Sequence, residues 1–285
     1  MSKNEKKGLQ AMAVCMIAAL LALLTFFSYE EAHRVRFADR RVGNAITKSS
    51  GTGKKPEDFR VEDFAKVEEL VLGLPAYFET LSDIERCMNL THLEIGERGS
   101  LGWIPEEEDI LGEEGIAQLE RELADILESC GQLEDLIIYN GCGTCNLSSL
   151  GFVEKGESLE KLRLYDIGEL DYSPVFSCRS LWSLVLDRCR VTDSDIKKID
   201  RLENLHWLSL SGTDITEAGN IGELKNLENL FLDGTDITEA GGLVNLENLK
   251  VLDITNTPLA GNAEELKFLR EALPDTKIVT DGEWW

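Results

Sequence analysis

Histidine is scarce in this chain of 285 residues, which holds only three: His33, His92 and His206. No G-x-S-x-G, H-E-x-x-H or Walker pattern is present. The spacings that place a serine nucleophile, a zinc site or a phosphate-binding loop are therefore missing. Acidic side chains are abundant, but nothing in the sequence selects two of them as an acid and base pair. The sequence predicts a protein that is not an enzyme and holds no cofactor and no metal.

Basic residues are also scarce over most of the chain, since residues 57–285 carry 19 basic and 49 acidic side chains. The formal net charge of the whole chain is -24. A surface this acidic repels a phosphate backbone, which argues against nucleic acid as a partner. Residues 1–56 have the opposite balance, with ten basic and four acidic side chains. The charge is therefore strongly polarised along the chain.

The amino end contains a run of 20 residues without a charge, residues 9–28 (LQAMAVCMIAALLALLTFFS). As a helix rising about 1.5 Å per residue, this run spans roughly 30 Å, the thickness of a bilayer core. A basic tail, residues 1–8, precedes it as in a signal sequence, but no small-x-small cleavage site follows. We predict an uncleaved transmembrane helix that anchors the chain, with a cleaved signal as the alternative.

The orientation of this anchor is not fixed by its flanks, because lysines precede it and arginines follow it. A lone N-terminal anchor more commonly leaves the amino end inside and the domain outside. We therefore expect a single-pass protein of the cell membrane whose domain is extracytoplasmic. A domain on the cytosolic side is the alternative.

Residues 29–56 show neither strand alternation nor a helical period, and they centre on TKSSGTG at 47–53. This composition is typical of a flexible linker. We expect a flexible basic stalk between the anchor and the domain that begins at residue 57.

The remainder of the chain repeats the pattern L-x-x-L-x-L. It occurs at 67–72, 90–95, 133–138, 159–164, 181–186, 205–210, 227–232 and 249–254, with a weaker copy at 273–278. The starts are mostly 22 to 26 residues apart, with one gap of 43. This pattern and this spacing are typical of a leucine-rich-repeat solenoid. The fourth and sixth positions of each unit point inward from a short strand, and successive strands pair in parallel. Over residues 57–285 we predict an α/β fold with parallel strands on a concave face, helices or 3-10 turns on a convex face, and capping ends.

Two nearly identical stretches, SGTDITEAG at 211–219 and DGTDITEAG at 233–241, show what the repeat encodes. Thr213 and Thr235 stand three residues after the last strand leucine, the slot that Cys189 and Thr257 fill in other units. A small polar side chain in this slot can hydrogen-bond the backbone of the turn. A metal site on the acidic residues of 233–236 is the alternative, but it offers too few oxygen ligands. We interpret the repeated stretch as scaffold.

One unit is longer than the others. Between the patterns at 90 and 133, apolar residues recur at helical spacing: Ile116, Leu119, Leu123, Ile126, Leu127 and Cys130. This spacing predicts a longer helix on the convex side. At the carboxyl end, Leu266, Leu269 and Leu273 predict a capping helix, and we expect Trp284 and Trp285 to close the core.

The repeats from 205 to 261 resemble most closely the 22-residue repeats of bacterial internalin-like leucine-rich-repeat proteins. The repeat pattern covers roughly residues 67–279. Thr or Cys stands where that family usually has Asn in the turn. The resemblance implies an adhesion or recognition scaffold, and it does not carry over a ligand.

Most cysteines have a place in the repeat. Cys87, Cys130 and Cys178 stand three residues before the first leucine of a unit, a slot that leucine fills elsewhere, so we expect free core thiols. Cys142 and Cys145 form a C-x-x-C pair just after a strand. An unreactive turn or local disulfide, a labile disulfide, and redox or zinc chemistry all stay open for this pair.

Side chains at the third, fifth and seventh positions of each unit point out of the concave face. The candidate ligand contacts there are Ile137, Tyr139, Arg163, Tyr165, Asp187, Trp207, Phe231 and Asp233. Exposed aromatics with an arginine among them favour an interface. The alternative is that they pack on one another along the strands.

These observations predict a membrane-anchored, non-enzymatic recognition or adhesion scaffold that binds a protein or peptide on its concave face. One alternative is a thiol redox-active or redox-sensing protein that uses Cys142 and Cys145. The others are an assembly scaffold on the cytosolic side and a structural envelope protein that binds nothing.

Overall fold

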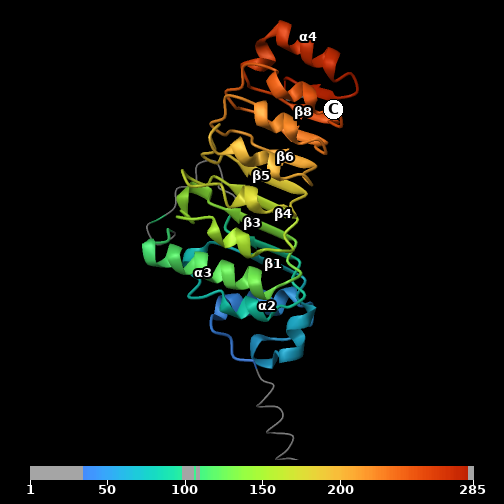
Figure 1. The fold of residues 1–285 in the computed structure, drawn as a ribbon. Helices are drawn as coiled ribbons and strands as arrows, with labels where there is room; N and C mark the ends of the chain where they lie inside the picture. The colour runs from blue at the N-terminus through green and yellow to red at the C-terminus, as the bar shows by residue number, and fades with distance from the viewer. Residues whose placement is uncertain (1–34, 98–105, 107–109, 282–285) are drawn as a thin grey trace, which may run out of the picture.

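The computed structural model describes residues 35–97, 106 and 110–281. They form an elongated stack of repeats along one parallel sheet, with α2 near one end and α4 at the other (Figure 1). The nine strands of this sheet follow one another in chain order. They are β1 Glu69–Leu72, β2 His92–Ile95, β3 Asp135–Tyr139, β4 Lys161–Tyr165, β5 Ser183–Asp187, β6 Trp207–Ser209, β7 Asn229–Phe231, β8 Val251–Asp253 and β9 Lys277–Val279.

A single column of leucines runs through the core and fixes the register of the strands. Its members pair in sequence and are each 0% exposed: Leu70, Leu93, Leu136, Leu162, Leu184, Leu208, Leu230 and Leu252. Each repeat buries its leucines only by stacking on its neighbours, as expected of a solenoid. The predicted leucine-rich-repeat fold with parallel strands is confirmed.

Short 3-10 helices cover the side of the solenoid opposite the sheet. Six of them are stacked there: η4 Ser82–Arg86, η7 Gly151–Lys155, η8 Val175–Ser177, η9 Ile196–Arg201, η10 Gly219–Glu223 and η11 Gly241–Asn245. Three more follow strands in the connecting turns: η3 Pro75–Tyr77 after β1, η6 Gly141–Gly143 after β3 and η12 Leu259–Gly261 after β8. The long unit replaces its 3-10 turn by α3, Glu113–Ser129. This helix packs between η4 and η7 and buries four of the predicted apolar positions, including Leu123 and Ile126. The predicted convex helix is confirmed.

The turn slot holds a buried hydroxyl that satisfies the backbone. In three successive units it donates to the carbonyl oxygen three residues earlier, at 2.6 to 2.7 Å: Thr213, Thr235 and Thr257. Cys189 fills the same slot and donates a weaker bond from Sγ to the carbonyl oxygen of Leu164, at 3.4 Å. The predicted role of these residues is confirmed, because a buried carbonyl without a partner would destabilise the turn.

Glycines at the end of the repeated stretches and just after them bring two units close together on the convex side. A Cβ built on Gly222 would lie 2.2 Å from the carbonyl oxygen of Gly242, and one built on Gly242 would lie 2.4 Å from the carbonyl oxygen of Gly219. Thus η10 and η11 pack backbone against backbone, with no room for a side chain between them.

The cysteines predicted to be core residues are buried and free. Cys87, Cys130 and Cys178 all belong to the main hydrophobic core. They behave as small apolar groups in positions that leucine occupies in other units.

The N-terminal end of the solenoid is closed by a helix that the sequence did not reveal. This helix, α2, runs over Arg40–Ser49, and the short helices η1 Pro56–Asp58 and η2 Val61–Lys66 follow it. The carboxylate of Asp39 caps α2 by accepting hydrogen bonds from the backbone amides of Arg41 and Val42. Residues 35–56 are therefore a folded end cap, and the expectation of a flexible stalk is wrong for them.

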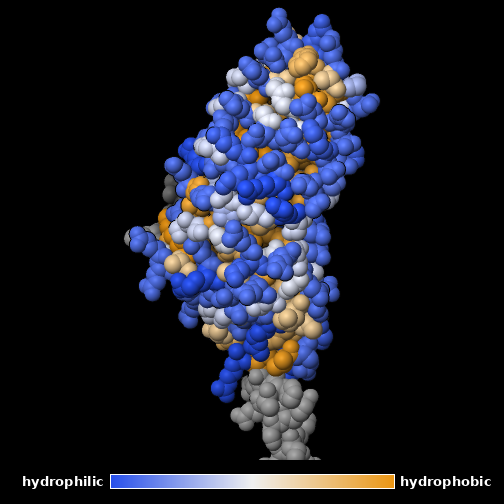
Figure 2. All heavy atoms as spheres, in the orientation of Figure 1, coloured by the Kyte–Doolittle hydropathy of each residue, from blue (hydrophilic) through white to orange (hydrophobic). Residues whose placement is uncertain are grey.

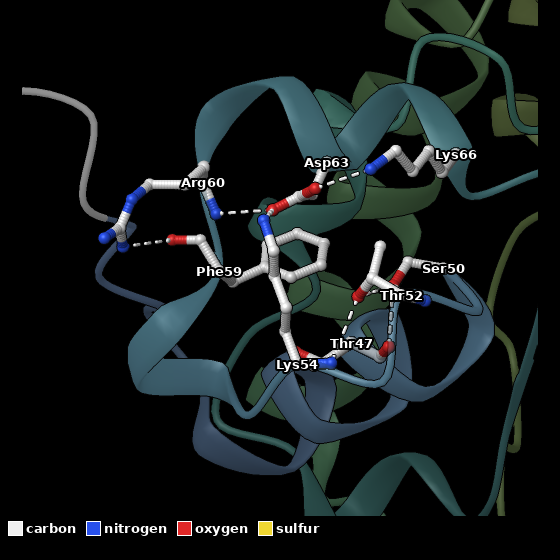
Figure 3. Close-up of polar contacts among 8 residues, drawn as sticks. All are labelled: Thr47, Ser50, Thr52, Lys54, Phe59, Arg60, Asp63 and Lys66. Atoms are coloured by element: carbon white, nitrogen blue, oxygen red, sulfur yellow. Dashed lines mark hydrogen bonds and ion pairs between the residues drawn. The ribbon is translucent and has the colours of Figure 1, made fainter.

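The end cap is held by an aromatic cluster and an ionic cluster. The rings of Phe37, Phe59 and Phe64 contact one another with centroids 5.2 to 5.9 Å apart. Beside them, the buried carboxylate of Asp63 accepts hydrogen bonds from Lys54, from Lys66 at 2.9 Å and from the backbone amide of Arg60 at 3.0 Å (Figure 3). Burial alone would raise the pKa of Asp63, but these hydrogen bonds outweigh burial and lower the pKa to about 2.

The carboxyl end carries the predicted capping helix, α4, over Ala263–Ala272, with Leu269 and Leu273 buried. Trp284 and Trp285 lie outside the described residues, as does the proposed anchor at 9–28. Among the helices that the structure describes, none has the length and the apolar composition needed to cross a bilayer.

Candidate functional site

The candidate site is the face of the sheet that points away from the leucine column, here called the outward face. Alternate strand residues form it, because successive side chains of a strand point to opposite sides. In the middle of the sheet its members are Asp135, Ile137, Tyr139, Lys161, Arg163, Tyr165, Ser183, Val185, Asp187, Trp207, Ser209, Asn229, Phe231 and Asp253. This is the face to which the sequence assigns the ligand.

On β3 to β5 the apolar residues of this face are buried rather than exposed. Ile137, Tyr139, Tyr165 and Val185 form a separate cluster and are 3 to 9% exposed. The two tyrosine rings stack with centroids 4.8 Å apart and an interplanar angle of 17°. For these residues the alternative interpretation applies: they pack on one another along the strands and stiffen the sheet. They are not the open ligand contacts that the sequence suggested.

On β6 and β7 the aromatic residues remain partly open. Trp207 and Phe231 are half-buried, and their ring centroids are 4.8 Å apart with an interplanar angle of 31°. Trp207 also packs against the buried tyrosine cluster. The pair therefore continues the row of apolar residues and keeps surface that a partner could cover.

Arg163 is held by a neighbouring carboxylate. Its Nη2 donates to Oδ2 of Asp135 at 2.6 Å, and Nδ1 of His92 lies 3.0 Å from the same oxygen. The other oxygen of Asp135, Oδ1, is buried without a hydrogen-bond partner. Arg163 is thus tied into a polar cluster of β2, β3 and β4.

Carboxylates continue along the C-terminal half of the outward face. Asp187 accepts a hydrogen bond from the hydroxyl of Ser209. Asp233, just beyond β7, accepts one from the side-chain amide of Asn256 at 2.9 Å. These bonds fix the two carboxylates at the carboxyl ends of β5 and β7, and they give this part of the face a negative charge.

Several residues of this face were not singled out from the sequence, among them His92, Asp135 and Ser209. All three stand at the third or fifth position of a repeat unit, the same positions as Arg163, Trp207 and Phe231 in other units. The rule that the third and fifth positions of a unit point outward applies to every unit and includes these three residues, because the register is regular from β1 to β9.

The structure shows no disulfide at Cys145, although a disulfide was one of the possibilities open for the C-x-x-C pair. Cys145 is a free, buried thiol whose Sγ donates to the carbonyl oxygen of Tyr139 at 3.1 Å. Burial raises the pKa of Cys145 to about 12, whereas a reactive thiol needs a lowered pKa. The side chain of Cys142 is not among those described. The structure therefore gives the redox hypothesis no support at Cys145.

Comparisons with known proteins agree with this fold. No family model matches the chain, and no curated protein matches it. Among solved structures, the chain is similar to internalin C2 of Listeria monocytogenes, with a TM-score of 0.58 and 17% identity over 85% of this chain and 94% of that one. A second internalin of that organism matches with a TM-score of 0.51 and 17% identity over 87% of this chain and 76% of that one.

A leucine-rich-repeat protein of Leptospira interrogans matches with a TM-score of 0.52 and 25% identity, over 76% of this chain and 50% of that one. These likenesses establish the class of fold, a leucine-rich-repeat solenoid of the kind found in bacterial internalins.

Proposed function

We propose that this chain is a membrane-anchored, non-enzymatic recognition scaffold that binds a protein or peptide on the outward face of its sheet. The contact is centred on Trp207 and Phe231. In this proposal residues 9–28 span the cell membrane once, and the solenoid lies outside the cytosol.

The observation that carries the proposal is that Trp207 and Phe231 remain partly exposed, whereas the apolar residues of the same face on β3 to β5 are buried. Trp207 packs against the buried cluster that contains the stacked Tyr139 and Tyr165, and Phe231 packs on Trp207 in turn. A rigid aromatic contact loses little conformational entropy on binding, and such residues are the ones that dominate interface energies.

The charge of the site favours one kind of partner. Asp253 pairs with Phe231 across β7 and β8, Asp233 follows Phe231 by two residues, and the whole chain carries a net charge of -24. Complementary charge steers association and suppresses wrong partners. A segment with apolar and basic side chains fits this face better than an acidic one.

The experiment introduces a photo-crosslinking benzoylphenylalanine at Phe231 in intact cells and identifies the captured protein. Its affinity is then measured for purified wild type, Trp207→Ala and Phe231→Ala. We expect each alanine variant to weaken binding about 30-fold, the effect of losing an interface hot spot of about 2 kcal/mol.

Trp182 provides the matched control. It is 42% exposed, stacks on His206 and precedes β5 outside the outward face. Benzoylphenylalanine at this position should not capture the same protein, and Trp182→Ala should bind it normally. Unchanged affinity of the Trp207 and Phe231 variants, with their thermal unfolding also unchanged, would show that the ligand binds elsewhere.

A further inference from the structure

The folded end cap concentrates basic charge at one end of an acidic molecule. Residues 35–56 contain six basic side chains and one acidic side chain, Asp39. Asp39 is buried, and its carboxylate accepts hydrogen bonds from backbone amides of α2 and of Glu79. Its charge therefore does little to neutralise the surface of the cap.

Two of the six basic side chains are already used within the fold. Lys54 pairs with Asp63, and Arg41 donates to the carbonyl oxygen of Tyr77. The other four are exposed and make no ion pair with another described residue: Arg36, Arg40, Lys48 and Lys55. These four residues are here called the basic quartet.

Two members of the quartet line an open hollow of about 480 Å³. Its walls are Val35, Arg36, Phe37, Arg40, Pro56 and Glu57. Glu57 sets one carboxylate against the two guanidinium groups, so the hollow keeps a net positive charge. Guanidinium groups bind phosphate through paired N–H donors.

The position of the hollow in the chain points to its occupant. The uncharged run ends at Ser28, and the described structure begins at Val35. Seven residues reach at most about 25 Å when fully extended. If residues 9–28 span a bilayer, the cap is tethered close to its surface, where the local concentration of lipid headgroups is high.

We propose that the basic quartet docks the end cap on an anionic bilayer, with a lipid headgroup phosphate in the hollow between Arg36 and Arg40. A basic cluster held within a screening length of a bilayer that contains anionic lipid is attracted to that surface, on either side of the membrane. The rest of the solenoid is acidic and is repelled by the same surface, so docking through the cap sets the solenoid away from the membrane. This inference rests on the proposed membrane anchor.

The test uses the full chain in lipid nanodiscs, either of phosphatidylcholine alone or with about one third phosphatidylglycerol. Exposed lysines are acetylated with a water-soluble ester, and the rate at each lysine is read by mass spectrometry. We expect Lys48 and Lys55 to react about fivefold more slowly in the anionic nanodiscs. Lys197 and Lys198, exposed on η9, are internal controls and should react equally in both.

Two variants connect the protection to the hollow. Arg36→Gln with Arg40→Gln should restore the reaction of Lys48 and Lys55 in anionic nanodiscs to the neutral rate. Lys197→Gln with Lys198→Gln removes the same number of charges and should leave the protection in place. Raising the salt to about 1 M, where the screening length falls to about 3 Å, should abolish the protection.

The outcomes separate the docking from the anchor. Incorporation into both kinds of nanodisc with equal acetylation rates overturns the docking and leaves the anchor standing. Binding only to anionic nanodiscs, with protection, supports the docking and overturns the anchor. Failure to bind either overturns both. Equal protection by inorganic phosphate in neutral nanodiscs would assign the hollow to a soluble anion and overturn the bilayer as its occupant.

Discussion

Asp63 is a buried carboxylate of η2, next to the end cap, 1% exposed and between the ammonium groups of Lys54 and Lys66. Its pKa is lowered to about 2 from an ordinary value of 3.8. A lowered pKa in the folded state stabilises the fold above the unfolded value, and this stabilisation is lost as the pH falls through the folded value. We expect Asp63→Asn to lose on the order of 2 kcal/mol of stability at pH 7. The measurement is urea unfolding from pH 7 to pH 2, in which wild type and variant should converge between about pH 4 and pH 2.

Asp58 gives a matched control, because it is exposed on the neighbouring η1. Asp58→Asn should leave the unfolding free energy within about 0.5 kcal/mol of wild type across the same range. A difference between Asp63→Asn and wild type that stays constant down to pH 2 would show that the ion pairs are not its source.

At the residue scale, the repeat register predicted the buried residues well and the outward ones poorly. It placed Cys87, Cys178 and Thr235 correctly, because a repeat unit assigns each position to the core or to the turn. It did not predict that Tyr139 and Tyr165 are buried. Alternation along a strand assigns a side chain to a face, but the depth to which neighbours on that face cover it depends on packing across strands.

Among the elements, η10 and η11 make the closest contact of the convex side described above. Gly222→Ala would place a methyl group against the carbonyl oxygen of Gly242, a rigid backbone atom. We expect this variant to lose about 1 to 3 kcal/mol of stability by overpacking. Chemical denaturation measures the change in unfolding free energy.

Gly219→Ala is the control within the same short helix, since a Cβ there would meet no atom within 4 Å. It should be neutral or stabilise the protein by up to about 1 kcal/mol, because alanine restricts the unfolded chain. Equal losses in both variants would mean that backbone conformation, and not the close approach of η10 and η11, controls these sites.

Strands and long helices were predictable because each depends on a repeated apolar signal. The leucine pattern located β1 to β9, and the spacing of Leu119, Leu123 and Ile126 located α3. The sequence did not predict helix α2, because this helix only covers the end of the stack and is not part of a repeat unit. It buries two large apolar residues, Val42 and Ile46, and this is too few to show a helical period in a basic segment.

For the molecule as a whole, the large excess of carboxylates predicts a stability that rises with salt. Like charges spread over the solenoid repel one another in the compact state, and salt screens this repulsion. Salt also weakens pairs such as Arg188 with Asp166, but exposed pairs contribute little. We expect the thermal midpoint in a non-ionic detergent to rise by about 3 °C or more between about 0.05 and 0.5 M sodium chloride. A falling midpoint would show that ion pairs outweigh the repulsion.

Because each strand stacks on the one before it, position in the sequence becomes height above the end cap. Neighbouring strands lie about 4.8 Å apart, so the five steps from β1 to β6 and the six steps to β7 set the pair at roughly 24 to 29 Å above β1. A cap resting on a membrane would hold Trp207 and Phe231 at that distance from the membrane surface, beyond the headgroups. There they could contact a neighbouring membrane protein that extends equally far from the bilayer. One inserted repeat would raise them by about 5 Å, so the number of repeats acts as the ruler that selects which neighbours can be met.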